Sequence, residues 1–265
     1  MSKIKPEDAA FTEAEYVRLL DMAASKYRFC TYGEELGEPF VIWRHDIDCS
    51  PHRALALAKI EAERHLRCIY HVLVSGRHYN VFEPEIADIL RKIGSLGHEI
   101  GLHFDMDVFG TTTSTPSEDL IQRISFEKEV VETITGAPAQ SISFHNYILN
   151  EGRIENTDKI CGMRNACAPS IRETYRYVSD SNGIWQEENL EDILSETPTH
   201  LHVLTHPIWW TETPLKPFQR FLRAVDGHRQ ANLAFYLSLM QRDGRLRTIA
   251  KRLGISNADL ESTHE

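Results

Sequence analysis

The sequence predicts an α/β protein built on a parallel sheet in a single domain, with a helical C-terminal extension. Short apolar runs alternate with amphipathic segments at least six times along the 265 residues, which is typical of parallel strands joined by right-handed helical crossovers. The length suits one large domain, and the sequence contains no internal repeat and no long linker. An irregular (β/α) barrel and an open doubly wound sheet both fit this alternation. The glycine-rich motifs typical of nucleotide-binding folds are missing from the sequence.

Capping signals mark the starts of the expected helices. Thr12 and Glu15 form a capping-box pattern at the first helix. Ser50 is an N-cap candidate, and Pro51 follows it at the favoured first helical position. A second capping box at 115–118 begins a long amphipathic helix. In chain order we expect a helix at 12–29, a strand at 39–44, a helix at 51–65, a strand at 68–74, a helix at 84–97, a strand at 98–104, a helix at 115–136, a strand at 142–144, a weak helix near 156, a strand at 176–179, a short helix near 189, a strand at 201–205 and helix from about 214 onward.

Composition and charge exclude several classes of protein. The chain has 29 Lys and Arg against 39 Asp and Glu, a net charge of −10, so it has no overall attraction for nucleic acid or anionic membranes. No apolar run is long enough to span a membrane, and the first residues lack the apolar core of a signal peptide. The five cysteines are an odd number without zinc-type spacing. We therefore expect a cytoplasmic protein with reduced thiols.

Histidine and aspartate gather where the expected strands end. The carboxyl ends of parallel strands meet at one face of the sheet, which is where such folds bind ligands. Five separate strands deliver His or Asp within or just after their last residues, so these side chains predict one polar site. They are His45, Asp46 and Asp48 for the first strand, His98, His103, Asp105 and Asp107 for the third, and His145, Asp180 and His206 for the others.

The residue types at these positions suit a divalent metal. Asp46 and Asp48 are two apart, so on an extended backbone they face the same side. Two carboxylates held together repel each other, which favours a bound cation or raises the pKa of one of them. His103 adds an imidazole and Asp107 or Asp105 adds a further carboxylate, giving a mixed nitrogen and oxygen set. Such a site generates a hydroxide nucleophile and polarises a carbonyl group.

Two further residues fit acid chemistry beside that metal, although ordinary structural roles exist for several of these side chains. His206 is the natural general acid, and Asp180 is the partner that orients it. Asp48 has an alternative role as a helix cap, which Ser50 already fills. Trp209 follows His206 closely and is either a core residue or a wall on which a sugar ring stacks.

These motifs resemble those of the polysaccharide deacetylases, carbohydrate esterase family four with a NodB-type domain, over roughly residues 40–210. The run 97–103, Gly-His-Glu-Ile-Gly-Leu-His, is the most specific match. Residues 44–48 look like the family's Thr-Phe-Asp-Asp-Gly motif, residues 204–206 match its Leu-x-His motif, and residues 180–185 are similar to its Asp-x-x-x-Trp motif with one extra residue. The resemblance implies an irregular (β/α) barrel, Asp46 as catalytic base, Asp48 and His103 as metal ligands, and His206 as general acid.

The chain departs from the family pattern at two places. The second metal histidine of the family is replaced by Asp107, so Asp107 is the expected third ligand, with Asp105 and His145 as alternatives. The metal is expected to be zinc, with manganese, iron or cobalt as alternatives. The family's Arg-x-Pro-Tyr motif is present only as residues 144–147, so the arginine that would orient the base is missing, and His145 or Arg44 can take its place. A backbone N–H near Tyr147 can complete an oxyanion site.

We therefore predict a metal-dependent hydrolase that removes an N-acyl group, most simply acetyl, from an amino sugar or sugar-containing precursor in cell-surface polysaccharide synthesis. His145, Tyr147 and Trp209 are the expected substrate-binding residues, and the expected partner is a small molecule or glycan precursor, with a homo-oligomer left open. The alternatives are hydrolysis of a non-sugar amide, imide or formamide, and a non-catalytic carbohydrate-binding role. The expected organisation is an N-terminal helix and connector at 1–39, the barrel at 40–212 and a helical extension at 213–265 packed on the same domain.

Overall fold

The computed structural model describes residues 11–34, 38–107, 118–145, 157–186, 188–242, 248, 251, 252 and 254. The chain divides into two compact units, Met1–Arg220 and Phe221–Glu265. All strands of the described residues belong to the first unit. Within the described residues, no helix is both long enough and apolar enough to cross a membrane.

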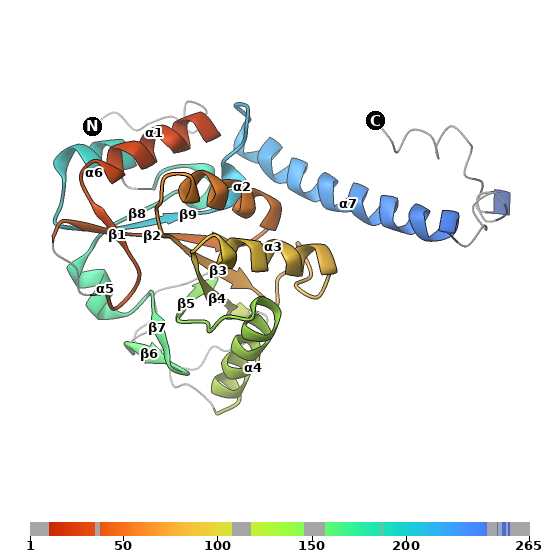
Figure 1. Cartoon of the computed structure of the whole chain (residues 1–265), viewed down its shortest axis with the longest axis horizontal. Coiled ribbons are helices and arrows are strands. Elements are labelled where there is room, and N and C mark those ends of the chain that lie inside the picture. The colour runs from red at the N-terminus through yellow and green to blue at the C-terminus, as the bar shows by residue number, and fades with distance from the viewer. Residues whose placement is uncertain are drawn as a thin grey trace. The chain divides into compact units, whose positions relative to one another are not determined.

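A curled, half-barrel sheet forms the centre of the first unit (Figure 1). Its strands lie in the order β6-β7-β5-β4-β3-β2-β9-β8, and β1 pairs with β2 beside that path. Every pairing is parallel except that of β6 with β7, so the predicted parallel α/β architecture is confirmed. The strands are β1 Arg28–Cys30, β2 Phe40–Ile47, β3 Ile69–Leu73, β4 Glu99–Asp105, β5 Ser141–His145, β6 Lys159–Ile160, β7 Met163–Asn165, β8 Arg176–Ser179 and β9 His200–Thr205.

Two helices begin where the sequence places their caps, whereas most of the capping box at 115–118 lies outside the described residues. The Thr12 hydroxyl accepts a hydrogen bond from the Glu15 N–H at 3.2 Å, and Ser50 caps the next helix with Pro51 at its first turn. Gly97 and Gly136 have positive φ angles just after two helices, a conformation that favours glycine. The helices are α1 Glu13–Ala24, α2 Pro51–Ala62, α3 Pro84–Ser95, α4 Glu118–Thr135, α5 Pro169–Thr174, α6 Leu190–Glu196 and α7 Pro217–Arg242, with short 3₁₀ turns η4 Ser181–Gly183 and η5 Pro207–Trp209.

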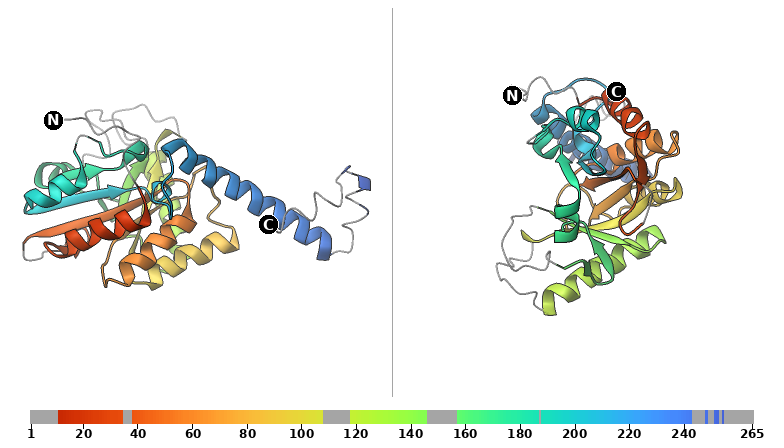
Figure 2. Two further views of the ribbon diagram at one scale, coloured as in Figure 1. Left: turned by 90° about the horizontal axis from the view of Figure 1, so that it is seen from above. Right: turned by 90° about the vertical axis from the view of Figure 1, so that its left-hand side faces the viewer.

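The outer face of the sheet packs against a row of helices. The contacts run from α6 to α1, α2, α3 and α4 in turn, and Figures 1 and 2 show these helices following the curve of the sheet. Trp43 and Ile47 of β2 point into this apolar core together with Leu57 of α2. Successive strand residues face opposite sides of the sheet, so Arg44 and Asp46 of the same strand face inward.

The inner face of the sheet has an apolar end and a polar end. Phe40, Ile42 and Ile69 form a second apolar cluster near the amino ends of their strands, together with Cys30, Tyr32 and Ala166. The polar residues come later in the same strands, toward the carboxyl ends. The apolar cluster therefore closes the inner face on one side, and the polar site opens on the other.

The fold contains elements that the sequence does not predict, namely β1, β6, β7 and α5. The first helix was expected to reach residue 29, but α1 ends at Ala24, and Arg28–Cys30 instead pairs with Phe40–Ile42 as β1. Tertiary pairing overrides local helix propensity here, because β3 pairs only with the later part of β2 and leaves this edge free. The helix near residue 156 lies outside the described residues, and the short helix α5 was not predicted. Strands β2, β3, β4, β5, β8 and β9 are confirmed.

Candidate metal and catalytic site

A cavity of about 970 Å³ opens at the carboxyl ends of the strands. Its lining draws on β2, β4, β5 and β9, which the parallel pairing brings together although they are distant in the sequence. Most of the predicted site residues line this cavity, namely Asp46, Asp48, His103, Asp107, His145, His206 and Trp209. Asp180 lies buried behind His206, and Tyr147 lies outside the described residues.

Asp48, His103 and His145 form a group whose ligand atoms all lie within 4.8 Å of one another. The Asp48 Oδ1 atom lies 3.2 Å from His103 Nε2 and 3.6 Å from His145 Nδ1. Burial disfavours the Asp48 carboxylate, but the two imidazoles outweigh burial and hold its pKa well below the usual range. The group therefore offers one oxygen and two nitrogen atoms, a donor set that suits zinc and other first-row divalent metals.

The protons around His103 show that a cation fits this group. The Ser143 hydroxyl donates its single hydrogen to the Asp46 carboxylate at 3.1 Å, so it must accept from His103 Nδ1–H at 2.7 Å. In neutral His103, Nε2 then carries a lone pair, which faces the equally electron-rich Asp48 Oδ1. That oxygen is buried and has no hydrogen-bond partner. Two lone pairs facing each other at 3.2 Å repel unless a proton or a metal ion lies between them.

The predicted third ligand, Asp107, is not part of this group. Asp107 is exposed on the cavity wall, and its backbone N–H donates to the Asp105 carboxylate at 2.9 Å. His145, which the sequence left as an alternative, comes from the end of β5 and completes the group instead. The metal-binding role of Asp107 remains a prediction.

Asp46 lies beside the metal group and is held by three donors. Arg44 Nη2 donates to its Oδ2 at 3.2 Å, while Ser143 Oγ and His71 Nδ1 each lie 3.1 Å from its Oδ1. The residue is 2% exposed. Burial disfavours the carboxylate, but Arg44, His103 and His71 outweigh that effect and keep the pKa of Asp46 well below its usual range. Asp46 is therefore a carboxylate at neutral pH.

His206 faces the same cavity from the opposite side and is backed by Asp180. Its Nδ1 lies 2.6 Å from Asp180 Oδ1, and its backbone N–H also donates to that carboxylate. The Trp210 indole donates to the other Asp180 oxygen at 2.9 Å. Burial disfavours the imidazolium, but Asp180 and Asp48 overcome it and raise the pKa of His206 to about 9. His206 Nε2 lies 3.8 Å from Asp48 Oδ2, so a protonated group faces the metal group.

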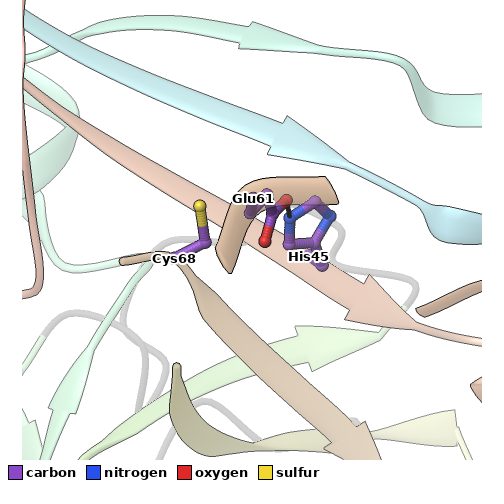
Figure 3. Close-up of side chains that lie close together, drawn as sticks. All are labelled: His45, Glu61 and Cys68. Atoms are coloured by element: carbon purple, nitrogen blue, oxygen red, sulfur yellow. Dashed lines mark hydrogen bonds and ion pairs between the residues drawn. The ribbon is translucent and has the colours of Figure 1, made fainter. Parts of the chain in front are cut away.

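His45, Glu61 and Cys68 form a second group of potential ligands, which Figure 3 shows on the helix-covered side of β2. All three are fully buried. The Glu61 carboxylate lies 2.7 Å from His45 Nε2, accepts from the Tyr70 hydroxyl at 2.7 Å and also accepts from Tyr16. A metal would have to replace these hydrogen bonds, so this group is best explained as a satisfied structural network.

Sequence reasoning missed the side chains that support the site. Neither His71 nor Ser143 is among the site residues predicted from the sequence. Both contact Asp46 directly. A sequence signal existed, since Ser141, Ser143 and His145 alternate along a short buried strand in which apolar residues fill the other positions.

No protein-family model and no curated protein matches the chain. Among solved structures, it is similar to the chitin deacetylase of the fungal pathogen Colletotrichum lindemuthianum at 14% identity and a TM-score of 0.42, covering 72% of this chain and 83% of that one. It is also similar to the peptidoglycan deacetylase PdaC of Bacillus subtilis at 12% identity and a TM-score of 0.42, covering 79% and 99%. A third is the Streptococcus pyogenes deacetylase PplD, at 12% identity and a TM-score of 0.43, covering 74% and 94%. Similarity at this level says nothing of activity, which has to be argued from the site.

Proposed function

We propose that this protein is a metal-dependent hydrolase that removes an N-acyl group, acetyl in the simplest case, from an amino sugar or a sugar-containing precursor used in cell-surface polysaccharide synthesis. The observation that carries the proposal is the 3.2 Å approach of His103 Nε2 to the buried, unpartnered Asp48 Oδ1, a place that a metal ion would fill beside the ionised Asp46. A cation, a base and an acid on one cavity are the parts that amide hydrolysis needs.

Each side chain has a separate task in this reaction. Asp48, His103 and His145 would hold the metal, which supplies polarisation of the amide carbonyl and a lowered pKa of the attacking water. Asp46 accepts the proton of that water. Its low pKa makes it a weak base, so it suits only a water that is already acidified. His206 is protonated below about pH 9 and donates its proton to the leaving amine.

The cavity supports a substrate larger than a simple amide. A volume of about 970 Å³ accommodates a sugar or an oligosaccharide end, and the aromatic rings of Trp209 and Tyr177 line it. Aromatic faces are suited to stacking against the apolar face of a sugar ring. We therefore favour an N-acyl amino sugar over an isolated small amide.

The test is hydrolysis by the full chain after chelation and reloading with zinc, manganese, iron or cobalt. The substrates are N-acetylglucosamine, UDP-N-acetylglucosamine, chitotetraose and a set of non-sugar amides, imides and formamides, scored for released acid and free amine. We expect metal-dependent release of acetate from an amino sugar. Preferential cleavage of a non-sugar amide, imide or formamide would show that the substrate is not an amino sugar. Binding of chitotetraose without cleavage in the presence of any of these metals would indicate a carbohydrate-binding protein.

Two variants connect that activity to the site. Asp46→Asn should abolish turnover while the protein still binds metal, because Asn cannot accept the proton. Asp48→Ala combined with His103→Ala should lose both the metal and the activity. Near-normal activity of Asp46→Asn would show that the base has been assigned wrongly.

A further inference from the structure

A line of buried polar side chains runs along the inner face of the sheet, away from the cavity, starting at Asp46. Asp46 Oδ1 lies 3.1 Å from His71 Nδ1, His71 Nε2 lies 2.9 Å from Ser141 Oγ, and Ser141 Oγ lies 2.6 Å from Glu99 Oε1. His71 and Ser141 are fully buried and Glu99 is 5% exposed. The metal-dependent chemistry proposed above uses only the first of these four residues.

The number of protons in this line is fixed by its hydrogen bonds. Asp46 pairs with the Arg44 guanidinium and accepts from the Ser143 hydroxyl, so it is a carboxylate that can only accept, and the hydrogen between it and His71 belongs to Nδ1. His71 is fully buried, and the charge of Asp46 is already met by the Arg44 guanidinium. Burial lowers the pKa of His71 to about 4, so its ring is neutral at neutral pH and Nε2 carries a lone pair. The Ser141 hydroxyl must then donate to Nε2. Its single hydrogen is used there, so the short contact with Glu99 needs a hydrogen from Glu99.

We infer that Glu99 is a protonated carboxylic acid at neutral pH, and that hydrogen bonds donated in one direction, from Glu99 to Ser141 to His71, make His71 present Nδ1–H to Asp46. His71 is thus a positioning residue for the base, and Glu99 and Ser141 fix its tautomer. This role rests on the proposed function of Asp46, whereas the protonation of Glu99 does not.

The surroundings of Glu99 and His71 agree with this direction. Burial raises the pKa of Glu99, the shift that favours its protonated form. Its nearest cation, Arg67, is engaged with Glu34 at 2.7 Å on the surface. The charged and titratable groups facing the line are Arg44, Asp46, His103, His202 and Tyr32 at the His71 end, and Arg67 and Glu34 at the Glu99 end.

The backbone leaves room for this arrangement at one position. Gly101 is paired with His71 in the sheet, and a Cβ atom there would lie 2.3 Å from the His71 ring at Cδ2 and 2.8 Å from Nε2. Any side chain at this position would displace the imidazole from between Asp46 and Ser141. The 97–103 motif therefore needs glycine at position 101, because only glycine leaves space there for the His71 ring.

Spectroscopy on the full chain with zinc added tests the inference without an activity assay. Nitrogen NMR of labelled histidine, with His71 identified by the signal lost in His71→Asn, should show a protonated Nδ1 and a bare Nε2 at neutral pH. Infrared spectra should show a carboxylic-acid carbonyl band that disappears in Glu99→Gln. A protonated Nε2, or a missing carboxylic-acid band, would overturn the inference.

A matched pair of variants tests the positioning role with chitotetraose as the probe. The Asn amide can replace the Nδ1 donor toward Asp46 but not the link to Ser141, and Gln reaches Ser141 but not Asp46. We expect kcat to fall about ten- to hundredfold in His71→Gln with KM nearly constant, and clearly less in His71→Asn. Equal losses in two folded variants would contradict the positioning role. Inactivity of the native chain would count against the proposed function instead, and the spectra would still decide the state of Glu99.

Discussion

Asp46 and Asp48 are two residues apart on one strand end, yet their carboxylates have different partners. Asp46 is surrounded by donors, Arg44 among them, and both of its oxygens are engaged. Asp48 Oδ1 faces His103 and His145 without a hydrogen bond. Asp46 Oδ2 accepts from Arg44 and retains a second lone pair that can take a proton, whereas the unsatisfied Asp48 Oδ1 suits a metal. The different tasks proposed for the two residues agree with these partners.

The identity of the third ligand is testable with a matched pair. We expect His145→Gln to weaken zinc binding by about tenfold or more, because it removes a nitrogen from the group around Asp48. Asp107→Asn should change the zinc affinity much less, since Asp107 lies exposed outside that group. Competition with a zinc chelator measures both affinities. A larger loss in Asp107→Asn would restore the ligand set predicted from the sequence.

The pH dependence of hydrolysis should report on Asp180. Activity that needs protonated His206 falls as the pH rises through the pKa of that imidazole, which is about 9. Asp180→Asn removes a charge that favours the imidazolium, so the alkaline limb of the kcat profile should move to lower pH by about one to two units. Trp210→Phe keeps the Asp180 charge and removes only one donor from it, so that limb should stay close to its native position. A profile unchanged in Asp180→Asn would exclude His206 as the acid.

At the scale of elements, β4 shows how one strand serves two faces. Ile100 and Leu102 pack in the apolar core between sheet and helices, while Gly101 and His103 face inward. Of these two inward positions, Gly101 has no side chain and so leaves space for His71, and His103 places its imidazole opposite Asp48. A shift of one residue in register would exchange these faces, so pairing of β4 with β3 and β5 fixes the site.

Two glycine substitutions in neighbouring elements should have opposite effects on stability. Gly101→Ala places a Cβ atom within 2.6 Å of the Ser141 carbonyl oxygen and 2.3 Å of the His71 ring, so we expect a loss of about 1–3 kcal/mol or more in the free energy of unfolding. Gly94→Ala lies inside α3 and meets only Ile100 at 3.7 Å, so it should gain about 0.5–1 kcal/mol. Urea denaturation measures both. A neutral Gly101→Ala would mean that the His71 ring has room to move.

At the scale of the whole first unit, Glu61 ties distant elements together. Its carboxylate on α2 contacts Tyr16 of α1, Tyr70 of β3 and His45 of β2. The His45 ring also contacts Thr205 of β9 at 2.7 Å, immediately before His206. Asp46 and His206 therefore stand on strands that share one buried network behind the sheet.

Glu61→Gln should destabilise the protein in a pH-dependent way. Burial disfavours the carboxylate, but His45, His98 and Tyr16 outweigh it and lower the pKa of Glu61. A lowered carboxyl pKa contributes stability above the unfolded value of about 4.3, and the contribution is lost as the pH falls through the folded pKa. We expect a deficit of about 1–3 kcal/mol at pH 7 that narrows below about pH 4. Tyr70→Phe, which removes a hydrogen bond and no ionisable carboxylate, should show a deficit with little dependence on pH over this range.

Local sequence signals predicted much of the fold and part of the site. Thr12 and Ser50 cap their helices as expected, because side-chain capping acts within a few residues. Asp48, His103 and His206 share one cavity as expected, because parallel strands present their carboxyl ends together. Strand β1 escaped prediction because its only reason to be extended is its pairing with β2, ten residues further along the chain.

The sequence alone determined which strands bring polar residues to the site, because the alternation of strands and helices places the carboxyl ends of those strands at the same face. Two of the expected residues lie elsewhere, since His45 points to the helix-covered side of the sheet (Figure 3) and His98 precedes β4 and contacts α2. The tertiary structure decided which of the polar residues contact one another. His145 rather than Asp107 joins Asp48 and His103, and His71 reaches Asp46 because Gly101 on the neighbouring strand leaves space for its ring. These choices depend on strand order, register and the direction of single hydrogen bonds between residues far apart in the chain, which no local pattern encodes.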